Sequence, residues 1–142
     1  MGATALPADL EQVTDEEDED VLLDRDALAR LLRVVDDNRE VLSLLIDSFL
    51  EDGPGLLDAM QRGAETHDAE ALRRAAHTLK SNSADFGAMA LSDLCKQLEA
   101  QVRQNHLDGT EQLVAEITDA YVPVAAALAH LKTTGADGSP DS

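Results

Sequence analysis

The chain has 142 residues, of which 44% are hydrophobic and only 2% aromatic, and its formal net charge is −18. That length is enough for one small domain, and the excess of acidic residues disfavours nucleic acid and anionic membranes as partners. With no Trp and so few aromatic side chains, the core must be built mainly from Leu, Val and Ala, which favours an all-α protein.

The charge pattern predicts one ordered domain between two tails. Residues 1–20 contain eight acidic and no basic residues, which would repel one another in a compact state, so we expect a disordered acidic tail over residues 1–21. The small, polar, turn-forming residues 134–142 predict a second disordered tail. The domain, residues 22–133, keeps nineteen acidic and eleven basic residues.

Targeting signals are not evident in the sequence. No run of about eighteen apolar residues is present, and the N-terminus lacks the regions of a signal peptide, so we expect a cytoplasmic protein that does not bind membranes. The single cysteine, Cys95, lies on an apolar helical stripe and is predicted to be a buried packing residue. Three lysines against eight arginines fit either a salt-rich cytoplasm or an ordinary acidic signalling protein, and both interpretations remain open.

Two helices are predicted in the first half of the domain. The first, over about residues 24–35, has Asp24 or Asp26 as its cap and leucines at helical spacing. The second, over about residues 39–65, is interrupted by Gly53-Pro54. Because proline inside a helix removes a hydrogen bond, we expect a kink there, or two helices in place of one.

Three further helices are predicted over about residues 68–86, 88–105 and 110–132. Asp68 is the expected cap of the first of these, and Pro123 is expected to bend the last. No segment alternates like a strand. Four longer helices with short connections predict an antiparallel up-and-down four-helix bundle, with the short N-terminal helix in addition.

The helix over residues 68–86 carries the chemistry of the chain on His77. Its apolar stripe, which faces the core, consists of Leu72, Ala76, Leu79, Ser83 and Phe86. His77 lies between that stripe and the solvent. Cationic and small side chains lie one turn before or after it, namely Arg73, Arg74, Lys80, Ser81 and Ala84.

These neighbours suit a nucleophile that meets an anion. Nearby cations favour the neutral, nucleophilic form of an imidazole, and they also attract negative charge. A phosphoryl group fits, because Lys80 can stabilise the negative charge on its oxygens during transfer. On this local pattern alone, an ordinary half-exposed helix histidine is an equally good interpretation of His77.

The run from Ala76 to Gly87 resembles the signature of histidine-containing phosphotransfer (HPt) domains, which reads approximately Ala-His-x-Leu-Lys-Gly-x-Ser/Ala-x-x-x-Gly-Ala. Matching positions are His77, Leu79, Lys80, Ser83, Gly87, Ala88, Leu91, Cys95, Leu98 and Glu99. Ser81 departs from the pattern, because the family most often has Gly there. A small residue at that position lets the backbone of a partner come close, and Ser is a mild replacement.

The resemblance implies a phosphoryl carrier with no kinase or ATP-binding domain of its own. His77 would accept a phosphoryl group from an aspartyl phosphate and pass it to another receiver in a phosphorelay, with Lys80 stabilising the group. The partners would be receiver domains of response regulators or hybrid histidine kinases, and Mg²⁺ is expected on the receiver, not on this chain. The chain is expected to be a monomer without a cofactor or metal of its own.

Residues around His77 are predicted to dock the partner. The set is Arg73, Arg74, Ser81, Ala84, Gly87, Lys96 and Arg103. For Lys96 and Arg103 a solvated helix face is the alternative interpretation.

Two other functions are alternatives to phosphotransfer. A helical adaptor that docks a receiver or other signalling protein without being phosphorylated is the main alternative, and the presence of His77 and Lys80 speaks against it. A histidine-dependent phosphatase would need a second acid or base beside His77, where the sequence offers Arg, Lys, Ser and Ala. His67, His106 and His130 lack the spacing of a helical metal site.

Overall fold

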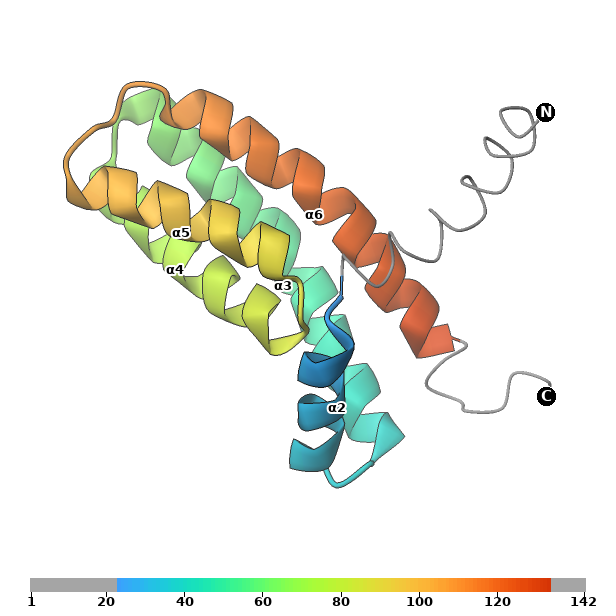
Figure 1. The fold of residues 1–142 in the computed structure, drawn as a ribbon. Coiled ribbons are helices and arrows are strands. Elements are labelled where there is room, and N and C mark those ends of the chain that lie inside the picture. The colour runs from blue at the N-terminus through green and yellow to red at the C-terminus, as the bar shows by residue number, and fades with distance from the viewer. Residues whose placement is uncertain (1–22, 134–142) are drawn as a thin grey trace, which may run out of the picture.

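The computed structural model describes residues 23–133, and within that range every regular element is an α-helix. The five helices are α2 (Arg25–Val34), α3 (Arg39–Thr66), α4 (Ala69–Asp85), α5 (Met89–Arg103) and α6 (Thr110–Thr133) (Figure 1). The all-α prediction and the five expected helices are confirmed, with boundaries close to those predicted. The tails predicted at residues 1–21 and 134–142 lie outside the described residues.

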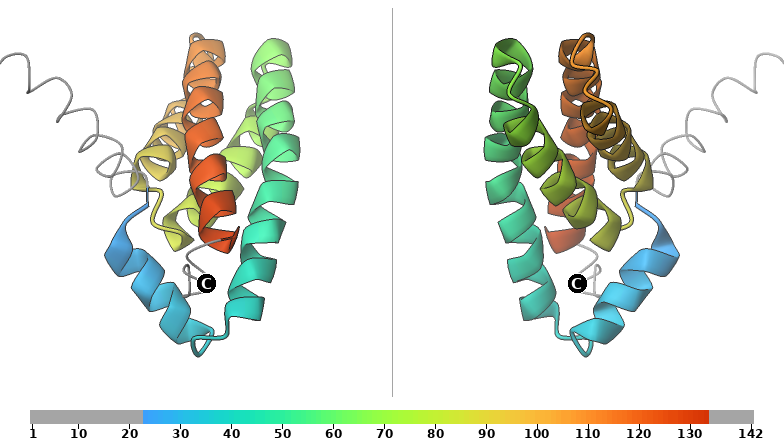
Figure 2. Two further views of the ribbon diagram at one scale, coloured as in Figure 1. Left: turned by 90° about the vertical axis from the view of Figure 1, so that its right-hand side faces the viewer. Right: turned by 90° about the vertical axis from the view of Figure 1, so that its left-hand side faces the viewer.

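The four longer helices pack so that each contacts two others. α4 packs against α3 and α5, and α6 packs against the same two helices. Figures 1 and 2 show α2 at one end of the molecule. There α2 and the first turns of α3 form the two arms of a V, joined at its point by the turn between them. The core is mainly aliphatic, and its fully buried side chains include Ile46, Met60, Leu72, Leu79, Leu98, Ile117 and Leu128. Cys95 is also fully buried, as predicted, and burial raises the pKa of its thiol to about 12.

Side chains in the turns cap two of the helices. The Asn38 carboxamide oxygen accepts hydrogen bonds from the backbone N–H groups of Glu40 and Val41, which begins α3. Asp68 caps α4, as predicted, by accepting from the N–H of Ala71. Asp24 occupies the cap position of α2 but makes no side-chain cap bond.

The predicted interruption at Pro54 does not divide α3, which runs as one helix of 28 residues. Packing explains why the chain continues through this point. Gly53 is buried against the Tyr121 ring of α6, where a Cβ would lie 2.1 Å from the phenol oxygen. The Tyr121 hydroxyl donates to the Phe49 carbonyl at 3.4 Å, and the two rings stack with centroids 5.5 Å apart. Tertiary contacts with Tyr121 therefore hold the helix in the turn that leads into the proline.

α6 is the most apolar helix, and by length and composition alone it could cross a membrane. Its Ile117, Val124 and Leu128 are buried in the core and form the apolar stripe that α6 packs against the bundle. The helix also runs through Pro123 without ending. Near its C-terminal end, Lys132 pairs with Asp47 and joins α6 to α3.

The turn between α4 and α5 depends on Gly87. Its φ of +78° is in the left-handed region, and a Cβ there would lie 2.6 Å from the backbone nitrogen of Asp24. That nitrogen donates a 2.8 Å hydrogen bond to the Gly87 carbonyl, which fixes the start of α2 on the turn. The turn folds α4 and α5 into a helical hairpin, the element that builds the functional site.

Candidate functional site

His77 stands on the outer face of α4. Its side chain is 58% exposed, whereas the preceding residue, Ala76, is fully buried. Ser81, one turn further on, is exposed, and Ala84 is half-buried. An imidazole on a packed helix, with small side chains along the same face, is held in place and accessible to another protein.

The partner of His77 comes from α5. Nδ1 of the imidazole lies 2.9 Å from Oε2 of Glu99. The two residues are equally far in sequence from Ala88, at the start of α5, so an antiparallel hairpin that turns there places them at the same level. The geometry of the hairpin thus creates the contact.

Lys80 completes a cluster of three side chains, His77, Lys80 and Glu99. The ammonium nitrogen of Lys80 lies 2.6 Å from Oε1 of Glu99, so each carboxylate oxygen has its own partner. The Glu99 side chain is only 7% exposed, against 28% for Lys80. A buried carboxylate is costly without hydrogen bonds and opposite charge, and these two partners supply both.

The charge state of Glu99 determines which nitrogen of His77 is free. Burial is the largest single effect and raises the pKa of the Glu99 carboxyl, but the hydrogen bonds from Lys80 and His77 together with their charge interactions outweigh it, and the net pKa is below its usual value. Glu99 is therefore ionised at neutral pH and only accepts hydrogen bonds. Nδ1 of a neutral His77 must then carry the proton, which leaves the lone pair on Nε2.

The predicted ring of cations around His77 is corrected by the structure. Arg73 and Arg74 both pair with Glu70, at 2.7 and 3.2 Å, and both are exposed. The group in contact with the imidazole is a carboxylate, because Glu70 holds the two arginines and Lys80 reaches Glu99. Arg73 and Arg74 remain candidates for docking a partner, as surface charges only.

The other residues predicted to dock a partner differ in burial and in contacts. Lys96 and Arg103 are exposed on α5, and neither residue has an ion-pair partner among the described residues. Gly87 is buried against Asp24, so it has a packing role in place of the docking role that was predicted.

Glu99 is the functional residue that the sequence-based prediction did not assign a role. Two signals pointed to it: it is acidic beside the apolar stripe of α5, and it matches His77 in distance from the α4–α5 turn. Ser92 strengthens the same hairpin, because its hydroxyl donates to the Lys80 carbonyl at 3.1 Å.

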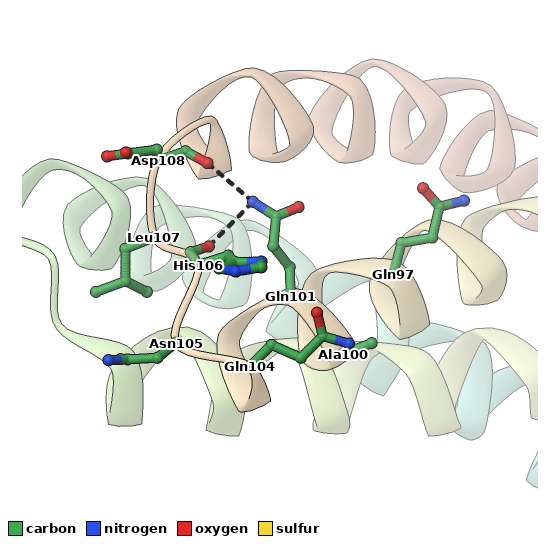
Figure 3. Close-up of a pocket in the computed structure, with 8 residues that line it drawn as sticks. All are labelled: Gln97, Ala100, Gln101, Gln104, Asn105, His106, Leu107 and Asp108. Carbon is green, nitrogen blue, oxygen red and sulfur yellow. Dashed lines mark hydrogen bonds between the residues drawn. The ribbon is translucent and has the colours of Figure 1, made fainter.

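A cavity of about 790 Å³ lies at the α5–α6 turn, away from the His77 cluster. Figure 3 shows the Gln101 carboxamide at its centre, donating to the carbonyls of His106 and Asp108. At 100° per residue, Gln97, Gln101 and Gln104 lie on the side of α5 roughly opposite Glu99. The hydrogen bonds of Gln101 hold the turn, and the cavity has no part in the His77 site.

Comparisons with known proteins agree with this geometry. A family model for the Hpt domain matches residues 44–131, which include His77, Lys80 and Glu99. The crystal structure of histidine-containing phosphotransfer protein B (HptB) from Pseudomonas aeruginosa PAO1 is similar, with a TM-score of 0.71 and 29% sequence identity over 78% of this chain and 94% of that one. No curated protein sequence matches. Because the family match spans more than half of the 142 residues, the chain belongs to the Hpt domain family, the histidine phosphotransfer domains of phosphorelays.

Proposed function

We propose that this chain carries a phosphoryl group on Nε2 of His77, taking it from an aspartyl phosphate of one receiver domain and passing it to another. The observation that carries the proposal is the bond between Nδ1 of His77 and the buried carboxylate of Glu99. That bond assigns the proton to Nδ1 and the lone pair to Nε2, on a side chain that is 58% exposed.

Each transfer step forms one bond and breaks one. The Nε2 lone pair attacks phosphorus, the bond from phosphorus to the aspartyl oxygen breaks, and the aspartate leaves as a carboxylate. The product ring carries the phosphoryl group on Nε2 and keeps its proton on Nδ1, so it is an imidazolium. The Glu99 carboxylate, in contact with Nδ1, stabilises the positive charge that develops on the ring. Return to a receiver aspartate reverses these steps.

Lys80 has two tasks in this proposal. Its ammonium balances the Glu99 carboxylate in the free protein, and it is one helical turn from His77, where phosphoryl oxygens would lie. As charge accumulates on those oxygens in the transition state, Lys80 stabilises it. The Mg²⁺ that such a transfer requires is expected on the receiver domain.

The packing of α3 to α6 supports the finer prediction of an antiparallel up-and-down four-helix bundle, with α2 in addition. Such a bundle holds His77 in one orientation while the partner brings the phosphoryl group into line with it. The acidic surface is suited to protein partners, not to nucleic acid, and we expect a cytoplasmic monomer that meets receivers of response regulators or hybrid histidine kinases.

The proposal is tested by incubating the chain with phosphorylated receiver domains from the same genome. Label should move to the parent chain and not to His77→Gln, which should melt like the parent because an exposed histidine adds little to the core. The label should be lost in acid and kept in alkali, and ³¹P–¹⁵N NMR should place it on Nε2. A chain that binds receivers but takes no label would instead be the adaptor described above.

A further inference from the structure

We propose that a cavity between α2, α3 and α4 is a socket for a lysine or arginine side chain of the receiver that docks on His77. This inference rests on the proposed function, because it names a recognition element of the same partner. The socket lies at the C-terminal end of α4, the helix that carries His77. It supplies both an apolar surface for an aliphatic stem and carboxylates for a cationic tip.

The lining of the socket matches that chemistry. Its volume is about 170 Å³, the space of roughly five or six water molecules at ~30 Å³ each, which is also the size of one long side chain. The apolar part is formed by Leu31, Leu45, Phe49 and Phe86, and the acidic part by Asp52 and Asp85. Lysine and arginine bury their stems on apolar surface while the charged head stays near water or a carboxylate.

The position of the socket places it within reach of a partner bound at His77. His77, Ser81 and Asp85 follow one another at four-residue steps, so they form one ridge along α4. Eight residues of helix span about 12 Å, well inside the footprint of a single docked domain. A contact at that distance from the reacting nitrogen fixes the rotation of the receiver about His77.

Asp85 is poorly placed for the stability of the free protein. It is the last residue of α4, where the helix dipole disfavours negative charge, and the last turn holds no basic residue. It is exposed, and within residues 23–133 no ion pair includes it. Asp52 is also exposed, and its contact with the Ser48 hydroxyl is long, at 3.5 Å. Both carboxylates are therefore available to an incoming cation.

The surface beside the socket is apolar as well. On α3, Val41 and Leu45 are each 37% exposed and Leu44 is 66% exposed. An apolar surface next to a pair of uncompensated carboxylates is complementary to a helix or loop with apolar residues and one buried cation. The charge of the socket selects a cationic side chain over a purely apolar one.

The test measures binding of an unphosphorylated receiver, so that it does not depend on transfer. The probe is the receiver from the same genome that labels His77 fastest or, where none labels it, the one that binds the chain most tightly. The double variant Asp52→Asn/Asp85→Asn should raise Kd about tenfold at low salt and reduce its salt dependence. The control, Asp119→Asn, neutralises an exposed aspartate of α6 in a groove with α3 and should leave Kd unchanged.

Two further readouts separate recognition from folding. Asp85→Asn should melt at or slightly above the parent temperature, because it removes a negative charge from a helix C-terminus. Ser48→Met should fill the socket from its exposed rim and raise Kd without losing helicity.

The outcomes distinguish this inference from the proposed function. Parent-like Kd for the double aspartate variant overturns the socket, even where His77 accepts phosphoryl normally. Weaker binding by Ser48→Met alone also overturns it, because the occupant would then be apolar. Weaker, less salt-dependent binding by the double variant supports the socket, even where His77 takes no label and the proposed function fails.

Discussion

Nδ1 of His77 and Oε2 of Glu99 are 2.9 Å apart, although 21 residues lie between them in the sequence. The contact joins an exposed ring to a buried carboxylate, so one end of the imidazole is fixed by the protein and the other end faces the solvent. Glu99 also holds Lys80, so a single carboxylate positions both side chains that the phosphotransfer proposal needs.

Removing the Glu99 carboxylate tests that arrangement directly. Glu99→Ala leaves Nδ1 without its acceptor and Lys80 without its partner, so the ring no longer has a fixed proton position or orientation. We expect acceptance of phosphoryl to slow by about a hundredfold in single-turnover assays, with receiver binding nearly unchanged. Lys80→Ala is the comparison variant and should slow transfer about ten- to a thousandfold while the proton on Nδ1 stays in place. Parent rates in Glu99→Ala would show that the ring needs no positioning.

Stability should depend on pH through the same carboxylate. The pKa of Glu99 in the folded chain is below its ordinary value of 4.5. The stabilisation that the ionised carboxylate gives to the fold is therefore fully present above pH 4.5 and is lost as the pH falls through the folded-state pKa. The free energy of unfolding should fall on acidification in the parent, and we expect a smaller fall in Glu99→Gln. Glu70→Gln is the control, because the Glu70 pKa is also lowered, by hydrogen bonds from Arg73 and Arg74, but that group is exposed and screened. Equal effects of the two variants in urea titrations would contradict this account.

The helices were predictable because their signals are local. Apolar periodicity and caps such as Asp68 act within one or two turns of the chain. Of the two outcomes expected at Pro54, a kink or two separate helices, the division into two helices is wrong, and the contact that holds the helix there, Tyr121 against Gly53, comes from α6. A local rule for proline does not include the packing that overrides it.

The site was predictable in part for the same reason. His77 and Lys80 lie within one helical turn, and the motif identified them together. Glu99 lies on the next helix, and although it matched the motif, its contact with His77 depends on how the hairpin folds. Gly87 matched the motif, but its burial depends on where α2 begins, which periodicity does not indicate.

The Ser83 hydroxyl is buried and has no hydrogen-bond partner among the described residues. An unpaired buried polar group costs about 1–3 kcal/mol, so Ser83→Ala should raise the unfolding free energy by about 1 kcal/mol. Ser92→Ala is the matched control, because the Ser92 hydroxyl is bonded to the Lys80 carbonyl and its loss should destabilise the chain by about 1 kcal/mol. Changes of opposite sign in the unfolding free energies of the two variants, measured by denaturant unfolding, would support this prediction. A loss of stability in Ser83→Ala would mean that the hydroxyl has a partner.

Gly87 and Gly55 should respond in opposite ways to alanine. Gly87→Ala forces a Cβ against the Asp24 backbone at a φ of +78°, so we expect a loss of more than about 1 kcal/mol and looser attachment of α2. Gly55 lies within α3 with no atom close to the position of its Cβ, so Gly55→Ala should gain about 0.5–1 kcal/mol from helix propensity. Thermal melts measure both, and hydrogen exchange in α2 should rise only in Gly87→Ala. Unchanged stability in Gly87→Ala would show that the turn relaxes without it.

Ser81 and Leu79 lie two positions apart on α4, one exposed and the other fully buried, and they separate access from stability. Transfer requires the reacting groups to approach within a few ångströms, so Ser81→Trp should block the receiver while the melting temperature stays near that of the parent. Leu79→Ala should do the reverse, losing about 2–5 kcal/mol of stability while the folded fraction transfers at a similar rate. Melts and single-turnover rates on both variants make the comparison. If Ser81→Trp accepts phosphoryl at the parent rate, the receiver does not approach over the ridge of His77, Ser81 and Asp85, and the docking face lies elsewhere on α4 and α5.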